Sequence, residues 1–242
     1  MSRKINIINK GYYDKNETLY KKKSIEIKSG VTVLTGCNGI GKTTLLHQIE
    51  SFLKKENIPC LMFDNLKDGG QNSISYHSLL EDFAFVATAI RSSEGENIVM
   101  NIGNLAARLN KFVRTGDSSN NDRYDKFFKA MGKLINKDSD KDKEEKEIPN
   151  ERWILLDAID SGFSVDNIVD LKEDLFKTIL EYNFGNEIYI VISANEYELC
   201  RGEQCFDVYN GKYITFKDYE DYRDFILRSR EWKEKRNRGK MD

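Results

Sequence analysis

Proline, histidine and tryptophan are the scarcest residue types, with two of each in 242 residues. So few histidines make a histidine-based catalytic site unexpected. The four cysteines supply no zinc-ligand pair, because Cys200 and Cys205 are separated by four residues, wider than the usual spacing, and no histidine cluster completes them. We therefore expect reduced thiols and little metal chemistry from these residue types.

Long hydrophobic runs are also missing. No stretch approaches the roughly 18 apolar residues of a membrane-spanning helix, and the basic start MSRKINIINK continues into polar residues. Lys and Arg number 38 against 40 Asp and Glu, a net charge of −2, so no overall field attracts nucleic acid. These absences predict a cytoplasmic protein without a membrane segment, on which any basic patch is local.

The composition that remains is typical of one folded domain. Hydrophobic residues make up 39% and charged residues 32%, which allows a core inside a well solvated surface. We expect a single domain over residues 1–242. Residues 114–150 are expected to be a variable, partly disordered insertion, because 136–150 carry charge at most positions and few apolar side chains. An exposed helix with alternating charges is the alternative.

Apolar β-branched runs alternate with helical patterns along the chain. This alternation predicts an α/β fold with a mostly parallel central sheet, preceded by N-terminal antiparallel strands and completed by a small helical subdomain. The predicted strands are 3–9, 24–28, 31–36, 60–63, 153–157 and 188–193, with a hairpin over 206–216 that turns at Asn210-Gly211. One helix is predicted directly after the glycine-rich loop. Four more are predicted over 79–90, 97–113, 165–182 and 217–238.

Residues 36–43 (GCNGIGKT) satisfy the phosphate-binding pattern G-x-x-x-x-G-K-[ST], between a predicted buried strand and an amphipathic helix. The glycines allow backbone N–H groups to turn inward, and the helix N-terminus adds its positive dipole end. Lys42 would reach the β- and γ-phosphates, and the Thr43 hydroxyl would hold Mg²⁺. The other residues assigned to the nucleotide are Asn38, Gly39, Gly41 and Thr44, the last of which is also suited to packing or capping.

Asp157 ends the apolar run WILLD at the carboxyl end of a predicted strand, where ligands bind in open α/β sheets. A carboxylate beside the phosphate loop would hold the metal through its water shell. Thr43 and Asp157 are therefore the expected Mg²⁺ residues.

Three motifs together resemble the ATP-binding-cassette (ABC) ATPases. The form G-x-N-G-x-G-K-T-T at 36–44 is similar to their Walker A sequence. Residues 92–96 (SSEGE) resemble their signature, with Ser93, Gly95 and Glu96 in register and Glu94 in place of the first glycine. Residues 160–164 (DSGFS) are similar to the D-loop of the branch that includes chromosome-maintenance and break-repair ATPases. An ordinary capping box is the alternative for 92–96.

The resemblance implies a P-loop NTPase fold, ATP and Mg²⁺ as ligands, and a homodimer in which each ATP lies between one subunit's Walker A and the other's signature. It also implies an aromatic residue that stacks on adenine, for which Tyr12 and Tyr13 are candidates; packed surface tyrosines are the alternative. A Q-loop residue would follow the strand at 60–63, with Gln71 and Asn65 as candidates.

Two hydrolytic positions depart from the family pattern. The glutamate expected after Asp157 is Ala158, whose methyl group cannot accept a proton, and the switch histidine is replaced by Asn195. We expect ATP to bind and close the dimer while hydrolysis is slow or uses a substitute such as Asp160 or Glu196. The catalytic candidates are thus Asp157, Asp160 and Asn195. An engineered Glu→Ala exchange at position 158 would give the same sequence.

The spacing between the motifs excludes some classes of ABC protein. About fifty residues separate Walker A from the signature, too few for long coiled coils, and the 114–150 insertion disfavours a transporter subunit. A compact stand-alone ATPase remains, similar to small proteins of bacterial mobile elements and antiviral defence systems. Two functions stay open: an ATPase that gates a nucleic acid or an effector protein, and a non-hydrolysing ATP-sensing adaptor.

The C-terminal helix, expected within 217–242, is basic. Seven cations and one tryptophan lie between Arg228 and Lys240. Such a stretch could bind nucleic-acid phosphates. A solvated helix end with favourably placed cations is the alternative.

Overall fold

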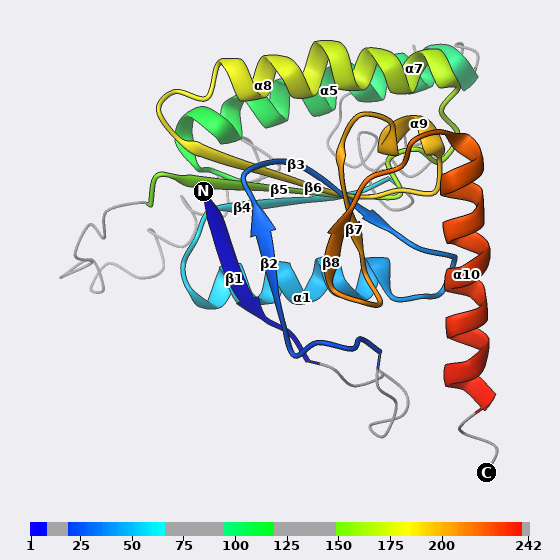
Figure 1. Ribbon diagram of the computed structural model, residues 1–242. Helices are drawn as coiled ribbons and strands as arrows, with labels where there is room; N and C mark the ends of the chain where they lie inside the picture. The colour runs from blue at the N-terminus through cyan, green and yellow to red at the C-terminus, as the bar shows by residue number, and fades with distance from the viewer. Residues whose placement is uncertain (9–18, 66–93, 119–148, 239–242) are drawn as a thin grey trace, which may run out of the picture.

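A six-stranded sheet with helices on both faces forms the centre of the computed structural model, which describes residues 1–8, 19–65, 94–118 and 149–238 (Figure 1). The strands are β1 Ser2–Asn6, β2 Ser24–Lys28, β3 Gly30–Thr35, β4 Cys60–Asp64, β5 Glu151–Asp157, β6 Glu187–Ser193, β7 Gln204–Asp207 and β8 Lys212–Ile214. The helices are α1 Lys42–Lys55, α5 Glu94–Thr115, α7 Val165–Asp170, the π-helical η1 Leu171–Phe176, α8 Lys177–Glu181, α9 Tyr197–Cys200 and α10 Tyr219–Arg238.

The strand order in the main sheet is β4-β5-β6-β3-β7-β8, and all neighbours are parallel except β7 and β8. Strands β1 and β2 pair antiparallel in a small second sheet. Helix α1 lies on the face next to this small sheet, and α5, α7 and α8 cover the opposite face (Figure 1). The predicted α/β class, the mostly parallel sheet and the N-terminal antiparallel strands are confirmed.

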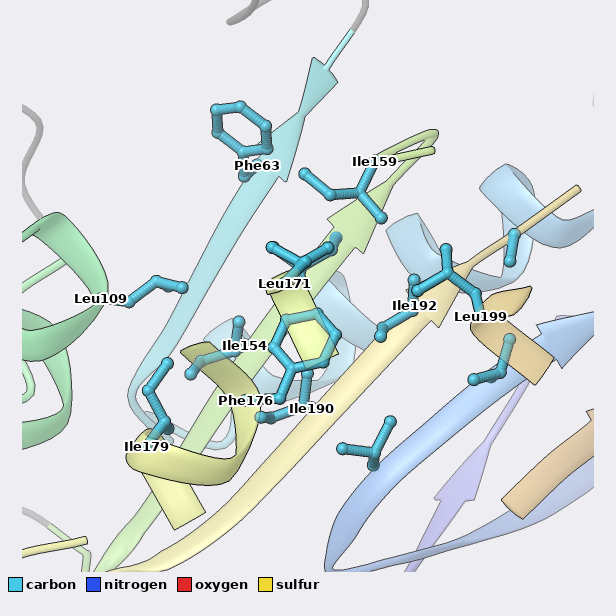
Figure 2. Packing of buried hydrophobic residues seen from close by; sticks show 14 of the residues in the cluster. Phe63, Leu109, Ile154, Ile159, Leu171, Phe176, Ile179, Ile190, Ile192 and Leu199 are labelled. Carbon is cyan, nitrogen blue, oxygen red and sulfur yellow. The ribbon is translucent and has the colours of Figure 1, made fainter. Parts of the chain in front are cut away.

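Each inner strand is buried on both faces because its side chains alternate between two cores. On one face, Ile154, Ile190 and Ile192 pack with residues of α5 and η1, including Leu109 and Phe176 (Figure 2). On the other face, the intervening residues of the same strands pack against α1; these are Trp153, Leu155, Tyr189 and Val191, with Leu45, Leu46 and Ile49 of the helix. The continuous apolar runs therefore place β5 and β6 at the centre of the molecule.

Several predicted boundaries differ from the structure. The first strand ends at Asn6 rather than residue 9, and α5 begins at Glu94 rather than residue 97, so Glu94–Glu96 form its first turn instead of preceding it. The helix expected over 165–182 contains the π turn η1, which the helical period does not predict. The helix expected over 79–90 and most of the 114–150 insertion lie outside the described residues. Within the described part of the chain, no helix is both long and apolar enough to span a membrane.

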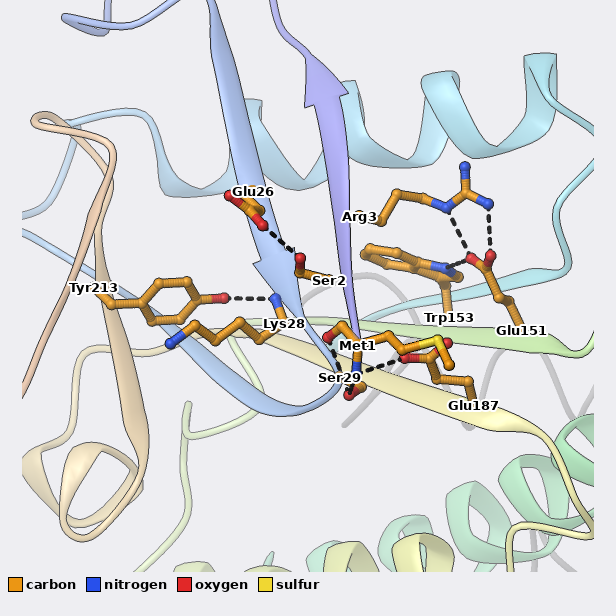
Figure 3. A network of polar contacts seen from close by, with 10 residues as sticks. All are labelled: Met1, Ser2, Arg3, Glu26, Lys28, Ser29, Glu151, Trp153, Glu187 and Tyr213. Atoms are coloured by element: carbon orange, nitrogen blue, oxygen red, sulfur yellow. Dashed lines mark hydrogen bonds and ion pairs between the residues drawn. The ribbon is translucent and has the colours of Figure 1, made fainter.

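A polar network joins the small sheet to the start of β5 (Figure 3). The Glu151 carboxylate accepts hydrogen bonds from Arg3 Nε at 2.9 Å, from Arg3 Nη2 at 2.5 Å and from Trp153 Nε1 at 3.1 Å. Burial by itself raises the pKa of Glu151, but these hydrogen bonds and the attraction to Arg3 outweigh it, so the pKa lies below its usual 4.5. The terminal ammonium of Met1 adds an ion pair to Glu187 at 3.0 Å.

We expect Glu151→Gln to lower the free energy of unfolding near neutral pH by about 1 kcal/mol, a small value because solvent screens the partly exposed pair. The pKa of Glu151 is lower in the folded chain, so its stabilising effect is present above pH 4.5 and is lost as the pH falls through the folded-state pKa. Urea unfolding at several pH values should therefore show the difference from wild type shrinking in acid. Glu231→Gln, on the exposed side of α10, is the control; a pH-independent difference would contradict the assignment.

Candidate functional site

The glycine loop, residues 36–41, joins the carboxyl end of β3 to the first turn of α1. Gly36 and Gly41 have φ values of 143° and 118°, which side-chain-bearing residues rarely adopt. A Cβ atom on Gly36 would lie 2.9 Å from Ile40 Cγ2, and one on Gly41 would lie 3.1 Å from the Tyr20 ring. The Tyr20 hydroxyl also donates to the Gly41 carbonyl at 2.9 Å. The glycines are thus required by the shape of the loop, as the sequence pattern predicts.

Lys42, the first residue of α1, is 7% exposed and lies beneath this loop. Its Nζ donates to the Gly36 carbonyl at 2.7 Å and to Asn195 Oδ1 at 3.0 Å. Burial lowers the pKa of Lys42, while Cys37, Asp160 and Asp157 oppose that shift. Within the described ranges Lys42 forms no ion pair with a carboxylate. A buried ammonium group whose hydrogen-bond acceptors are all neutral is stabilised by an anion bound beside it.

Thr43 and Asp157, the two residues assigned to Mg²⁺, are in contact. Thr43 Oγ1 donates to Asp157 Oδ1 at 3.1 Å, and Asp157 is 4% exposed at the end of β5. Hydroxyl and carboxylate oxygens are the ligands that Mg²⁺ prefers. Among the residues that the structure describes, no group of three or more His, Cys, Asp or Glu side chains is arranged to hold a metal. Any Mg²⁺ here would therefore depend on water or a bound ligand for its remaining contacts.

Asp64 is a carboxylate at this edge that the sequence analysis did not single out. It ends β4, is 9% exposed and pairs in register with Asp157 on the adjacent strand. The signal was present in the sequence, because the run CLMFD ends in Asp as WILLD does. Asp64 and Asp157 are neighbours because β4 and β5 are adjacent in the sheet, and the order of strands in a sheet cannot be read from the sequence.

Asp160 connects the loops that follow β5 and β6. Its Oδ2 accepts the backbone N–H groups of Asn195 at 2.6 Å and Glu196 at 2.7 Å, and the side chain is 5% exposed. Asn65 Nδ2 donates to the carbonyls of Ala158 and Ser161 at 3.2 and 3.0 Å. Asp160 and Asn65 therefore hold the two loops in place, and these bonds favour a structural role for Asp160 over that of a solvent-facing base.

Ala158, immediately after Asp157, has a φ of 51° and is half-buried. This left-handed conformation is uncommon for a residue with a Cβ atom. Its methyl side chain brings no proton acceptor to the position next to Asp157. The side-chain oxygen of Asn195 is in turn occupied by Lys42.

The remaining candidates are placed only in part. Asn38 and Gly39 are exposed in the glycine loop, and Thr44 is half-buried in the first turn of α1. Gly95 lies in the first turn of α5. The candidates Ser93, Tyr12, Tyr13 and Gln71 lie outside the described residues.

Three residues of α10 that the sequence analysis did not connect with this site contact the glycine loop. They are Ser229, Lys233 and Arg236. Their helical spacing shows only that they share a face. No local sequence pattern predicts that this face of α10 packs against the glycine loop, which lies almost two hundred residues earlier in the chain.

The structure thus defines an α/β protein whose glycine loop, buried lysine and acidic strand ends meet at one edge of a mostly parallel sheet. No family model matches the sequence, and no curated protein matches it. Among solved structures, the chain has a likeness to the crystal structure of Stu0660 of Streptococcus thermophilus, with 12% identity, covering 83% of this chain and 75% of that chain. The TM-score of 0.31 is too low to support an argument about fold or function.

We expect Asp160→Ala to lower the free energy of unfolding by roughly 2–4 kcal/mol, because it leaves two backbone N–H groups without their charged acceptor. Chemical denaturation of the purified variant measures this loss. Asp170→Ala, on an exposed position of α7, should change stability by less than about 0.5 kcal/mol. Equal stabilities of the two variants would show that Asp160 does not hold the loops together.

Proposed function

We propose that this protein is an ABC-type P-loop ATPase that binds ATP with Mg²⁺ at the glycine loop, dimerises around the nucleotide and gates a partner. The observation that carries the proposal is the burial of Lys42 without a carboxylate partner in the described residues. Its two hydrogen-bond acceptors are a carbonyl and an amide oxygen, and Asp157 and Asp160 attract the ammonium group without an ion pair to it. Phosphate oxygens would pair with the ammonium group directly.

The surroundings of Lys42 favour phosphate over other anions. The lysine stands at the N-terminus of a 14-residue helix, whose dipole attracts negative charge, and it follows a loop whose glycines allow close backbone approach. A loop followed by Lys and Thr in this order is typical of sites for nucleoside triphosphates. These features support the nucleotide class.

Thr43 and Asp157 fit the metal part of the proposal. Their oxygens are already within hydrogen-bonding distance, so one cation could take the hydroxyl oxygen directly and the carboxylate through water. The ion would neutralise part of the phosphate charge. Asp64 adds a second carboxylate on the neighbouring strand.

The proposed ATPase is slow. No side chain at position 158 accepts a proton, the Asn195 oxygen is engaged by Lys42, and Asp160 is buried with Oδ2 holding two backbone groups. Loss of general-base catalysis costs about 10²–10⁴ in rate. The same features favour the second candidate function, a non-hydrolysing ATP-sensing adaptor in a bacterial defence or mobile-element complex.

The dimer and the partner rest on the resemblance to ABC proteins. In that arrangement the first turn of α5, which contains Gly95, would face the nucleotide of a second copy. The partner would be an effector protein or a nucleic acid bound through the basic stretch between Arg228 and Lys240. Lys233 and Arg236 already donate to backbone carbonyls, which leaves fewer cations of α10 available for phosphates of a nucleic acid.

We expect Lys42→Ala to weaken Mg²⁺-ATP binding by roughly tenfold to a hundredfold, because charge-assisted hydrogen bonds to phosphate are lost. Isothermal titration calorimetry with ATP and Mg²⁺ measures the affinity. Lys54→Ala, at the opposite end of α1, where Lys54 pairs with Glu50, is the matched control. Equal affinities of wild type and Lys42→Ala would exclude the site.

We expect Ala158→Glu to raise the rate of ATP turnover by about 10²–10³, because it restores a proton acceptor beside Asp157. Phosphate release from the purified proteins measures the rate, and gel filtration with ATP and Mg²⁺ measures dimer formation. Ala158→Gln provides a side chain of the same size without a carboxylate. Wild-type turnover at the rate of motor ATPases that disappears in Lys42→Ala would contradict slow hydrolysis.

A further inference from the structure

Helix α10 lies against the glycine loop on the side formed by the loop's backbone carbonyls. Lys233 Nζ donates to the Asn38 carbonyl at 2.8 Å. Arg236 donates to the next two carbonyls, from Nη2 to Gly39 at 3.2 Å and from Nη1 to Ile40 at 3.3 Å. Three consecutive carbonyls of the loop are thus held by two cations of one helix, which runs past the end of α1 in Figure 1.

A fourth contact joins the same helix to the start of the loop. The Cys37 N–H donates to Ser229 Oγ at 2.8 Å, and Ser229 Oγ donates to the Ile226 carbonyl at 2.8 Å. Ser229 is 1% exposed, so this bond is shielded from water. Residues 37–40 each make at least one hydrogen bond to α10.

The helix also contacts parts of the fold other than the glycine loop. The Tyr222 hydroxyl donates to the Asn195 carbonyl at 2.5 Å. Trp232 stacks on Tyr209 with ring centroids 5.5 Å apart, and Phe225 is buried. The position of α10 is therefore fixed relative to Asn195, which also binds Lys42.

Holding these carbonyls has a consequence for the opposite side of the loop. In a trans peptide unit the carbonyl of one residue and the N–H of the next point in opposite directions. When the carbonyls of Asn38 and Ile40 face α10, the N–H groups of Gly39 and Gly41 face away from it. Two cations beside the loop also raise the positive potential at any anion bound there.

We propose that Lys233 and Arg236 are positioning residues for the phosphate site, which hold the glycine loop in its anion-binding conformation and couple the position of α10 to nucleotide affinity. This inference rests on the proposed nucleotide binding. The coupling is reciprocal: a partner that shifts α10 changes the affinity for nucleotide, and bound nucleotide restrains α10.

The test compares Lys233→Met, Arg236→Met and the double variant with Lys235→Met. Lys235 is a neighbouring, exposed cation of the same helix, so its variant removes the same charge without a loop contact. We expect each single loop-contact variant to bind Mg²⁺-ATP roughly threefold to tenfold more weakly, and the double variant more weakly still. Lys235→Met should bind Mg²⁺-ATP with wild-type affinity. Lys233→Arg, which retains a hydrogen-bond donor, should also keep an affinity close to that of wild type.

Hydrogen exchange of the backbone amides of residues 37–41, measured without nucleotide, is the second readout. We expect faster exchange in the double variant and no change in Lys235→Met, with unfolding midpoints of all variants close to wild type. Normal ATP affinity in the double variant, with Lys42→Ala still defective, would overturn this inference alone. Equal weakening by Lys235→Met would also overturn it, because a general loss of charge would explain the effect.

Failure of the proposed function gives a different result. In that case wild type and Lys42→Ala both fail to bind nucleotide, and the proposed coupling between α10 and nucleotide affinity is overturned together with the proposed function. Faster exchange in the double variant would then support only the loop-holding part, and unchanged exchange would overturn that part as well.

Discussion

The burial of the Lys42 ammonium group is the constraint on which the rest of the site depends. Placing a charge in the interior is costly unless hydrogen bonds and an opposite charge compensate it. The Gly36 carbonyl and the Asn195 side chain supply hydrogen bonds, and the N-terminus of α1 makes the location more positive still. The fold thus holds the ammonium group at the N-terminus of α1, against the backbone of the glycine loop.

The loops around that point are held by side chains of other segments. Asp160 fixes the loop after β6, Asn65 fixes the loop after β5, and Ser229 with Lys233 and Arg236 fixes the glycine loop. These bonds are made largely to backbone N–H and C=O groups. Within the described ranges, the candidate site is accordingly a set of loops held by hydrogen bonds at one edge of a mostly parallel sheet.

Much of the fold and the centre of the site could be predicted from the sequence because their signals are local. Apolar β-branched runs gave β5 and β6, and the glycine spacing gave the loop and the start of α1. The start of α5 was placed three residues late, since helix ends depend on capping and packing rather than on period alone. The π turn η1 was missed because its buried residues, Leu171 and Phe176, lie five apart, whereas a helical pattern assumes a spacing of three or four.

The sequence by itself determined the α/β class, the glycine loop with Lys42 and Thr43, and the absence of a proton acceptor at Ala158. Only the tertiary structure decided that Asp64 adjoins Asp157, that Asp160 holds the Asn195 loop and that α10 lies on the glycine loop. The physical reason is the range of the interactions. Periodicity and glycine requirements act within a few residues, whereas strand order and helix docking join segments that are distant in the chain and leave no local pattern.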